Sequence, residues 1–377
     1  MDAYLVDFAR SPYHFARKGR LASLRPDDLA AQVVRDLVRR QPFDPALIDD
    51  VMLGCAYPEG EQGDNLARIV SLLAGLPESV SGITMNRFCG SSMSAIHTAA
   101  GAIALGAGDV FLCVGVESMS RVPQGGLSPA PNPWLKEHYP TAYVSMGITA
   151  ENLARRYEIS REEQDAFAAR SQRKAGAALV RGAFEPEVVA VRTAEGTVDT
   201  DGCLRPATTV EVLAGLKPAF LPDGSVTAGT SSPLTDGATA VLVASEAFVR
   251  THALVPMARI VSVATAGCPP ELMGIGPVPA TRKALARAGL RLEQIDVVEL
   301  NEAFAAQALA CLRELDLDEG RVNLDGGAIA IGHPLGATGA RITAKAAQLL
   351  QRGHGCYAIA TQCIGGGQGI ATVLERA

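Results

Sequence analysis

A cysteine stands where an extended segment gives way to a helix in TMNRFCGSSMSA, residues 84–95. Free N–H groups at a helix N-terminus favour a thiolate, so this position predicts a pKa for Cys89 below the usual value of about 8.5. Gly90 gives the backbone room, and the small Ser91 and Ser92 leave space for a substrate. The alternative is a small core residue, because most free cysteines are buried. Cys89 needs partners before it can be interpreted as a nucleophile.

Two further Gly-rich segments carry candidate partners. DGGAIAIGHPLGATGAR, residues 325–341, holds His333 between a glycine and a proline, which excludes mid-helix and mid-sheet positions and favours a functional loop. The alternative is a histidine on a surface loop. In TQCIGGGQGIA, residues 361–371, Cys363 precedes three glycines whose N–H groups suit an oxyanion hole. The alternative there is a Gly-rich turn with Cys363 as filler.

A fourth segment, ELNEAFAAQ at residues 299–307, places Asn301 and Glu302 at the end of an apolar strand, although Asn301 could simply cap the next helix. Two cysteines, one histidine and Gly-rich turns suit cleavage of a carbon–carbon bond beside a carbonyl group. One thiolate attacks the carbonyl and holds an acyl group, while a second thiol exchanges a proton with carbon. The histidine accepts a proton and donates a hydrogen bond to a developing oxyanion.

Length and composition limit the class of protein. A chain of 377 residues is too long for one simple core and indicates two or three domains. A net charge of -6 without a dense Lys/Arg block argues against nucleic-acid binding. The eight cysteines form no CxxC pair, so we expect reduced thiols, a cytoplasmic location and no metal site. No signal peptide or apolar run long enough for a membrane span is expected.

Hydrophobic patterning predicts the elements that position these motifs. Strands are expected at 3–8, 51–56, 83–88 and 110–118, with helices at 27–40, 66–76 and 91–106 between them. This alternation predicts an α/β fold with a largely parallel sheet covered on both faces. IDDVMLGCA resembles IDVVELNEA, and the Cys89 segment parallels the His333 segment, which indicates two copies of one α/β fold. Residues 119–235 are more irregular and include a helix from 161 to 181 that opens with a capping box.

Taken in order along the chain, six motifs resemble those of thiolases over essentially its whole length: NRFCGSSM, TAENLA, TAGTSS…DGA, NEAFAAQ, GGAIAIGHPLGATGAR and CIGGGQG. The resemblance implies a thiolase-like fold of two similar α/β halves plus an inserted loop domain. The N-terminal half would span 1–118 and be completed by 236–255. The CoA-binding insertion would span 119–235, and the C-terminal half 256–377.

The same resemblance implies the catalytic roles. Cys89 becomes acylated, and His333 activates it and lines a first oxyanion hole, which a water held by Asn301 completes. Cys363 exchanges a proton with carbon 2 of the acetyl group. Backbone N–H groups of Cys89 and Gly365 form a second hole for the thioester oxygen. Coenzyme A is implied as a co-substrate, with no permanently bound cofactor; the implied contacts are Arg205 near the adenine, Ser232 near the pantetheine, and Met146 and Met273 at the acyl pocket.

The motifs FCGSSM, SREEQDAFAARS and TAGTSS resemble degradative bacterial 3-ketoacyl-CoA thiolases, including the β subunits of fatty-acid oxidation complexes. That implies a homodimer or a dimer of dimers, and a hydratase/dehydrogenase subunit as a partner. One alternative is an acetoacetyl-CoA thiolase, which usually has an NASG-like turn where this chain has TSSP, and a histidine where it has Ser145. A second alternative is a non-catalytic lipid-binding or scaffold protein, but such a protein should have lost a cysteine or histidine of the site.

Overall fold

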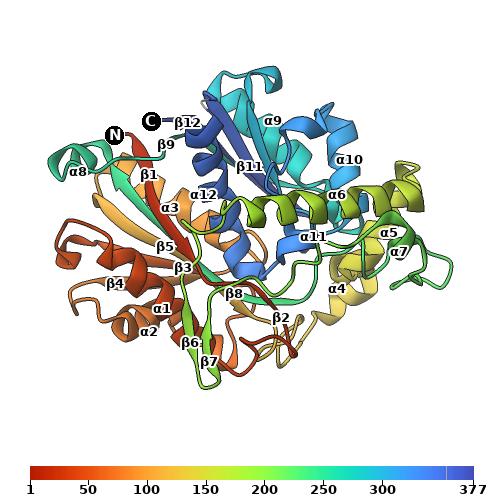
Figure 1. The fold of residues 1–377 in the computed structure, drawn as a ribbon, viewed down its shortest axis with the longest axis horizontal. Coiled ribbons are helices and arrows are strands. Elements are labelled where there is room, and N and C mark those ends of the chain that lie inside the picture. Colours follow the sequence, from red (N-terminus) through yellow and green to blue (C-terminus); the bar gives the residue numbers. More distant parts are fainter. Residues whose placement is uncertain (354) are drawn as a thin grey trace.

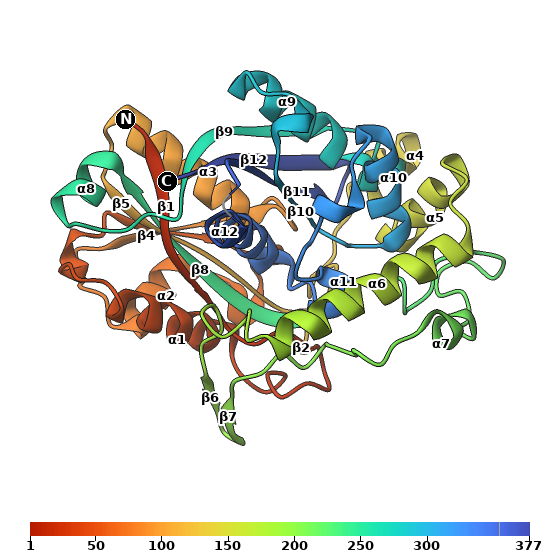
Figure 2. The same cartoon turned by 45° about the horizontal axis from the view of Figure 1, so that its top comes forward.

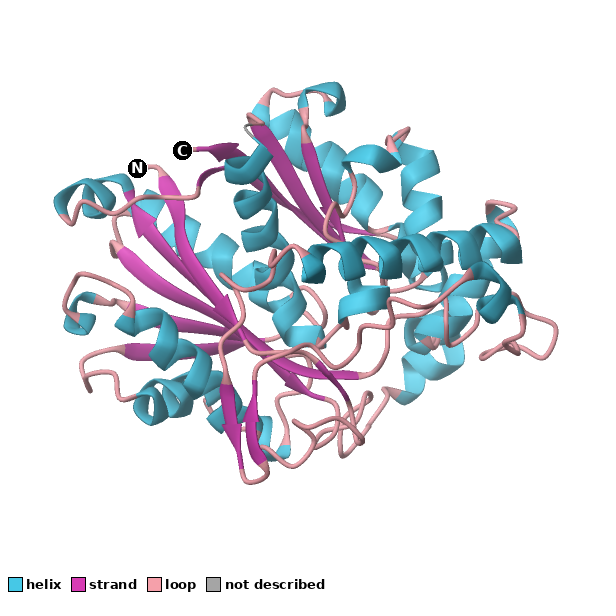
Figure 3. Cartoon of the chain, in the orientation of Figure 1, coloured by secondary structure: helices cyan, strands magenta, loops and turns pink. Residues whose placement is uncertain are grey.

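Two halves with the same strand order build the protein, for which the computed structural model describes residues 1–353 and 355–377 (Figures 1 and 3). In the first half the order is β4-β3-β5-β8-β1. In the second it is β10-β11-β12-β9, and Val322 bridges Val298 at the position that β4 occupies in the first. The predicted pair of similar α/β halves is confirmed. The strands are β1 (Ala3–Arg10), β3 (Asp50–Gly54), β4 (Ser81–Met85), β5 (Val110–Ser118), β8 (Thr235–Ser245), β9 (Ala258–Gly267), β10 (Val297–Leu300), β11 (Tyr357–Ile364) and β12 (Gln368–Arg376).

The halves join into one mixed sheet where β1 pairs with β9 through only two residue pairs. The pairs β3–β4, β3–β5 and β10–β11 are parallel, whereas β5–β8, β8–β1, β9–β12 and β12–β11 are antiparallel. The short β2 (His14–Phe15) pairs with the first two residues of β8. The prediction of a largely parallel sheet was wrong. Strands such as β5 and β8 are buried along their whole length, so their continuous apolar runs look the same in either orientation.

Helices cover both faces of the sheet, and a central pair separates the two halves. Figure 2 shows α9 on one outer side, α1 and α2 on the other, and α12 between the strands of the two halves. The helices of the two halves are α1 (Pro26–Arg39), α2 (Leu66–Ala74), α3 (Ser91–Leu105), α8 (Glu246–Thr251), α9 (Pro277–Ala288), α10 (Ala305–Leu315), α11 (Ala328–Ile331) and α12 (Leu335–Gly353). The central pair consists of α3 and α12. From Leu335 to Leu350 nearly every α12 side chain is buried, as expected for a helix enclosed on all sides.

Small residues let α3 and α12 approach at backbone distance. A Cβ added to Gly339 of α12 would lie 2.6 Å from the backbone nitrogen of Met93 in α3. One added to Gly115 of β5 would lie 2.4 Å from the carbonyl oxygen of Gly336. These contacts bring the N-termini of the two central helices together. Because Cys89 and His333 lie just before those N-termini, the glycines set the geometry of the predicted site.

The segment Phe88–Leu105, which contains α3, is long and apolar enough to cross a membrane by length and composition, contrary to the expectation from the sequence. In the fold it packs against α12, and His97 on it forms a 2.8 Å hydrogen bond with Thr372 of β12. A core helix of a layered fold passes the same test of length and composition, because the side chains that it packs against other elements are apolar.

The region between β5 and β8 contains most of the remaining helices and a small hairpin. They are α4 (Pro133–His138), α5 (Met146–Arg156), α6 (Arg161–Val180), α7 (Val210–Ala214), β6 (Val191–Thr193) and β7 (Gly196–Val198). The capping box predicted from Ser160 and Glu163 is confirmed at the start of α6. Where this region begins and ends as a domain stays a prediction.

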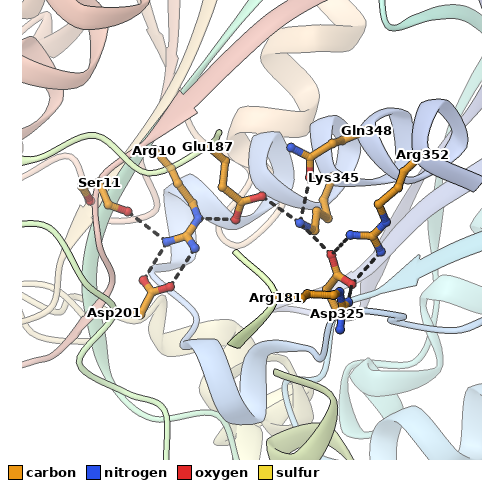
Figure 4. Close-up of polar contacts among 9 residues, drawn as sticks. All are labelled: Arg10, Ser11, Arg181, Glu187, Asp201, Asp325, Lys345, Gln348 and Arg352. Atoms are coloured by element: carbon orange, nitrogen blue, oxygen red, sulfur yellow. Dashed lines mark hydrogen bonds and ion pairs between the residues drawn. The ribbon is translucent and has the colours of Figure 1, made fainter. Parts of the chain in front are cut away.

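A buried chain of ion pairs fastens this region to the two halves (Figure 4). Arg10 of β1 pairs with Glu187 and with Asp201, and Glu187 also accepts from Lys345 of α12. Lys345 in turn lies 3.0 Å from Asp325, which also pairs with Arg181 and Arg352. A charge removed from water costs several kcal/mol unless it is paired, so each member requires the others. No sequence motif indicated this network, because its members come from five separate segments.

Candidate active site

Three loops and the end of one strand bring the predicted catalytic residues together near the centre of the fold. Cys89 directly precedes the Gly90 N-cap of α3, and His333 lies between α11 and α12. Asn301 follows β10, and Cys363 lies near the end of the neighbouring parallel strand β11. Parallel strands present their carboxyl ends at the same edge, which puts Asn301 and Cys363 side by side. Hydrogen bonds join this edge to the segments before the two central helices, from Asn301 to His333 and from Gln362 to the carbonyl oxygen of Cys89.

The backbone of Cys89 is attached to the strand that carries Cys363. Gln362 donates from Nε2 to the carbonyl oxygen of Cys89 over 2.5 Å. A Cβ at Gly90 would lie 2.5 Å from the Cδ1 atom of Ile364, so a larger residue at this position would force that side chain to shift. The sequence pattern indicated a steric role for Gly90 but did not reveal Gln362, whose only signal is its place beside Cys363.

Cys89 is partly buried, and the backbone N–H of Gly365 is near enough to its thiol to favour the thiolate form. Burial raises the pKa of this thiol to about 11, and the charge of Glu117 adds to the effect, while the Gly365 N–H opposes it. The predicted pKa below the usual value was wrong. Desolvation outweighs the helix N-terminus, so the resting thiol is protonated and a base is needed to form the thiolate.

Phe88 has a left-handed backbone conformation, with φ of 43°, which is uncommon for a bulky side chain. Its N–H donates to Asn86 Oδ1 over 2.7 Å, and its carbonyl oxygen accepts from Ser91 Oγ over 2.6 Å. Its ring lies 5.9 Å from that of Tyr57. Strained residues that the surroundings hold in place cluster at functional sites, and this one turns the chain so that Cys89 faces the site. The sequence did not reveal it.

His333 is buried, with 4% of its surface exposed, so the alternative of a surface-loop histidine is wrong. Its Nδ1 lies 2.6 Å from Thr338 Oγ1, and its Nε2 lies 3.3 Å from Asn301 Nδ2. An amide nitrogen can only donate, so Nε2 is the unprotonated nitrogen of the neutral ring. Burial, and then the charge of Arg341, lower the pKa of His333 to about 4. The ring is therefore a neutral base at pH 7, with its lone pair on Nε2.

Asn301 does not cap a helix, because α10 begins at Ala305 with Phe304 as its N-cap. Its Nδ2 donates to His333, and its buried Oδ1 has no hydrogen-bond partner among the described residues. A buried carbonyl oxygen without a partner is costly and commonly binds an ordered water. Asn301 therefore fits the water-holding role that the resemblance implies, and that role stays a prediction.

Cys363 is buried in a small apolar cluster with Met273 and Phe304, and Met146 packs against the same cluster. Burial raises the pKa of the Cys363 thiol well above its usual value, and the proximity of Cys89 is the next cause. A protonated thiol in an apolar pocket is suited to donating a proton to carbon. A Cβ built on Gly365 would lie 3.9 Å from the sulfur of Met146, so Met146 lies beside Gly365, and its role at the acyl pocket stays a prediction.

The two other predicted CoA contacts lie in different surroundings. Ser232 donates its backbone N–H to the carbonyl oxygen of Ala303 over 2.9 Å, which places it beside the loop that follows Asn301. Arg205 is exposed, and its guanidinium lies 5.5 Å from the ring centre of Phe15, on which Lys18 also lies at 4.6 Å. The structure brings Ser232 to the site, while for Arg205 it shows only this cationic surface around Phe15.

Glu117 is a further residue that sequence reasoning missed, although a single carboxylate at the end of an otherwise apolar strand is a usable signal. It is fully buried and accepts from the backbone N–H groups of Ala56, Tyr57 and Gly336, and from Gln62 Nε2. It thereby ties the loop after β3 to the first turn of α12. Within residues 1–353 and 355–377, no group of three or more His, Cys, Asp or Glu side chains is placed to bind a metal ion.

The family models and the similar proteins all identify the same family. Residues 3–247 match the thiolase N-terminal domain, and residues 254–376 match the thiolase C-terminal domain. A 3-ketoacyl-CoA thiolase of Shewanella denitrificans is 50% identical, with 100% of this chain and 99% of the relative covered. The 3-oxoadipyl-CoA/3-oxo-5,6-dehydrosuberyl-CoA thiolase of Escherichia coli is 49% identical over 100% of this chain and 99% of its own.

A solved structure agrees with these relatives. The crystal structure of human mitochondrial 3-ketoacyl-CoA thiolase superimposes with a TM-score of 0.92 at 40% identity, covering 100% of this chain and 99% of the other. A second structure of that human protein, in complex with CoA, gives the same TM-score and identity, with 98% of it covered. The chain therefore belongs to the thiolase family of acyltransferases, as the six motifs predicted.

Proposed function

We propose that this thiolase cleaves 3-ketoacyl-CoA with free CoA, giving acetyl-CoA and an acyl-CoA shortened by two carbons. One observation carries the proposal: the protonated thiols of Cys89 and Cys363 lie close enough to interact, and Asn301, which follows the strand beside Cys363, contacts the neutral His333 over 3.3 Å. Relatives about 50% identical over their full length are named for this reaction. Coenzyme A is the co-substrate, and the chemistry of these residues requires no permanently bound cofactor.

In the first step His333 accepts the proton of the Cys89 thiol at Nε2, and the sulfur attacks the 3-keto carbon. The oxygen becomes an oxyanion, which His333 and a water on Asn301 stabilise by hydrogen bonds. The bond between carbons 2 and 3 then breaks, its electron pair passes to carbon 2, and Cys363 protonates that carbon. Acetyl-CoA leaves, the acyl group stays on Cys89 as a thioester, and Cys363 becomes a thiolate.

In the second step the Cys363 thiolate takes the proton of the incoming CoA thiol. The CoA sulfur attacks the thioester carbonyl, whose oxygen accepts hydrogen bonds from the N–H groups of Cys89 and Gly365. Cys89 leaves as a thiolate, which recovers its proton from His333. Both cysteines and the histidine return to their starting protonation, and the same steps in reverse perform a Claisen condensation.

The acyl chain would lie along the apolar cluster of Met146, Met273 and Phe304. Ser232 would contact the pantetheine, while Arg205 and Lys18 at Phe15 would supply positive charge for the nucleotide phosphates. The apolar lining favours a hydrocarbon chain over one that ends in a carboxylate. A dicarboxylic substrate is nevertheless a second candidate, because the relative from Escherichia coli is named for 3-oxoadipyl-CoA and is 49% identical.

The enzyme would act in the cytoplasm as a homodimer or a dimer of dimers. The edge strand β4 supports this assembly, because it leaves Ile83 45% exposed and one side of its backbone unpaired in the sheet order. Exposed apolar edge strands are templates for pairing with another chain. A hydratase/dehydrogenase subunit would be a partner if the enzyme works in fatty-acid oxidation. Sedimentation of the purified protein tests the assembly.

Thiolysis of 3-ketoacyl-CoA substrates from about four to sixteen carbons, and of 3-oxoadipyl-CoA, tests the reaction and its substrate. Activity that rises with chain length supports the degradative assignment. Activity confined to the four-carbon substrate would instead favour acetoacetyl-CoA, and a preference for 3-oxoadipyl-CoA would favour the dicarboxylic candidate. Absence of thiolysis with every substrate would contradict the proposal.

Three variants distinguish the roles of Cys89 and Cys363. Cys89→Ala is expected to abolish the acyl-enzyme, which mass spectrometry detects on the intact chain. Cys363→Ala should still become acylated from a simple acyl-CoA but should not cleave the carbon–carbon bond. Cys356→Ala, which changes an exposed cysteine, is the matched control and should behave as the unchanged enzyme. Full turnover by Cys363→Ala would contradict the proton-donor role.

A further inference from the structure

The second ring nitrogen of His333 has a partner that neither the motifs nor the proposed mechanism uses. Nδ1 lies 2.6 Å from the hydroxyl oxygen of Thr338, in the first turn of α12. Thr338 is fully buried, and its hydroxyl lies 3.0 Å from the carbonyl oxygen of Pro334, to which it donates. A hydroxyl has one proton to donate and two lone pairs. With that proton directed at Pro334, the oxygen is free to accept the Nδ1–H of His333.

This arrangement decides which nitrogen of His333 can act as a base. An Nδ1–H that donates to Thr338 leaves the lone pair on Nε2, the nitrogen that faces Asn301. If Nδ1 had no acceptor, its N–H would be buried without a partner, and the ring would favour the tautomer with the proton on Nε2. That tautomer cannot take a proton from Cys89. The tautomer of a catalytic histidine is generally set by the group bound to its other nitrogen.

The same contact matters more once the base has accepted its proton. The imidazolium carries an N–H on both nitrogens, inside a pocket where burial and Arg341 disfavour positive charge. Nε2–H then faces the reacting groups, and Nδ1–H needs an acceptor that does not move. The Thr338 oxygen is held by its bond to Pro334 and by the rigid helix.

We propose that Thr338 is a positioning residue for catalysis: its hydroxyl accepts the Nδ1–H of His333 and thereby keeps Nε2 unprotonated and aimed at the Cys89 thiol. The inference depends on the role of His333 in the proposed function, and it concerns a residue that does not touch the substrate.

The α12 helix offers a matched control. Thr343, one and a half turns later, is also fully buried and donates its hydroxyl to the carbonyl oxygen of Gly339 over 2.7 Å, and no histidine within residues 1–353 or 355–377 is bonded to it. Four purified variants are compared: Thr338→Val, which keeps the shape and removes the hydroxyl; Thr338→Ser, which keeps the hydroxyl; Thr343→Val; and His333→Gln. Thermal unfolding is followed for each variant, and steady-state thiolysis of a 3-ketoacyl-CoA substrate gives its kcat and KM.

Thr338→Val is expected to lower kcat/KM about 10- to 100-fold, the range that follows from leaving one buried polar group unpaired. Thr338→Ser should stay within about threefold of the unchanged enzyme, and Thr343→Val should lose stability without a comparable loss of rate. Equal losses of kcat/KM in Thr338→Val and Thr343→Val would overturn the inference, because both hydroxyls would then act only through the stability of the helix. If Thr338→Val keeps its full kcat/KM and His333→Gln is inactive, the inference is overturned and the proposed function still holds.

Failure of the proposed function has a different signature, namely full activity of His333→Gln. A direct reading of the tautomer completes the test. Histidine labelled with ¹⁵N distinguishes protonated from unprotonated ring nitrogens, and with six histidines in the chain the signals of His333 are identified by their absence in His333→Gln. We expect an Nδ1–H ring in the unchanged enzyme and an Nε2–H ring in Thr338→Val. The same tautomer in both would overturn the inference.

Discussion

Glu117, the last but one residue of β5, accepts a 2.9 Å hydrogen bond from the backbone N–H of Gly336 at the start of α12, across the boundary between the two halves. Gly336 is three residues beyond His333, and the same carboxylate accepts from the loop after β3. The distance between the two halves at the active site is therefore fixed by a buried charge rather than by side-chain packing alone.

Replacing this carboxylate should impair both folding and turnover. Glu117→Gln puts an NH₂ group against backbone N–H donors, and hydrogen bonds to a charged group contribute about 1.5–3 kcal/mol. We expect a free energy of unfolding lower by about that amount and a kcat/KM lower by more than about tenfold. Glu59→Gln is the control, because that carboxylate also accepts two backbone N–H groups, from Leu127 and Ser128, but at the surface. Equal behaviour of the two variants would show that Glu117 has no special role.

The approach of α3 to α12 gives a second prediction. In Gly339→Ala the new methyl group would lie 2.6 Å from the Met93 backbone nitrogen, which cannot move away as a side chain can. Overpacking of this kind costs about 1–3 kcal/mol, and it would move His333 relative to Cys89. Gly101→Ala, in the same helix pair, meets no atom within 4 Å and should stabilise by about 0.5–1 kcal/mol. Urea denaturation and thiolysis assays on both variants check these opposite signs.

The pH dependence of kcat/KM reports the protonation of His333 in the free enzyme. Burial and Arg341 lower its pKa to about 4, from an ordinary value of 6.5, so the basic form persists when the pH falls below neutrality. We expect kcat/KM for thiolysis to stay nearly constant from pH 8 to about pH 5.5. An ordinary pKa would instead reduce it about tenfold at pH 5.5, and such a decrease would contradict the assignment.

The buried ion network should tolerate the loss of a member poorly. Lys345→Met removes the ammonium that joins Glu187 to Asp325, and breaking a buried pair costs about 3–5 kcal/mol. Lys283→Met changes an exposed lysine that donates to the Thr265 carbonyl oxygen, and it should change stability by less than about 0.5 kcal/mol. Chemical denaturation of both variants gives the comparison, and a loss below about 1 kcal/mol in Lys345→Met would contradict the prediction.

The same network sets an acid limit to stability. Burial alone would raise the pKa of Asp325, but its hydrogen bonds from Arg352 and the charge of Lys345 lower it to about 2, from an ordinary 3.8. A depressed pKa stabilises the fold above the unfolded value, and this contribution is lost as the pH falls from about 4 towards 2. In Lys345→Met the loss should begin at a higher pH. Coincident acid-unfolding curves for the two proteins would show that Asp325 is not the responsible group.

The sequence was sufficient to predict elements that depend only on residues close together in the chain. The Ser160 and Glu163 capping box, the helix after Cys89 and the strand at 110–118 all appear where the pattern predicted them. Strand direction was not predictable, because an apolar run buried on both faces is the same in parallel and antiparallel sheets. The pKa of Cys89 was predicted in the wrong direction, because burial depends on which distant segments cover a side chain.

The sequence by itself determined the family, the two-fold repetition of the α/β unit and the identity of the reactive side chains, since glycine turns and short motifs are encoded by neighbours in the chain. Only the tertiary structure decided how these side chains are protonated and held. Thr338 on Nδ1 of His333, Gln362 on the carbonyl oxygen of Cys89 and Glu117 on the start of α12 are contacts between packed elements. Hydrogen bonds and desolvation act over a few ångströms of space, so they become visible only when the chain is folded.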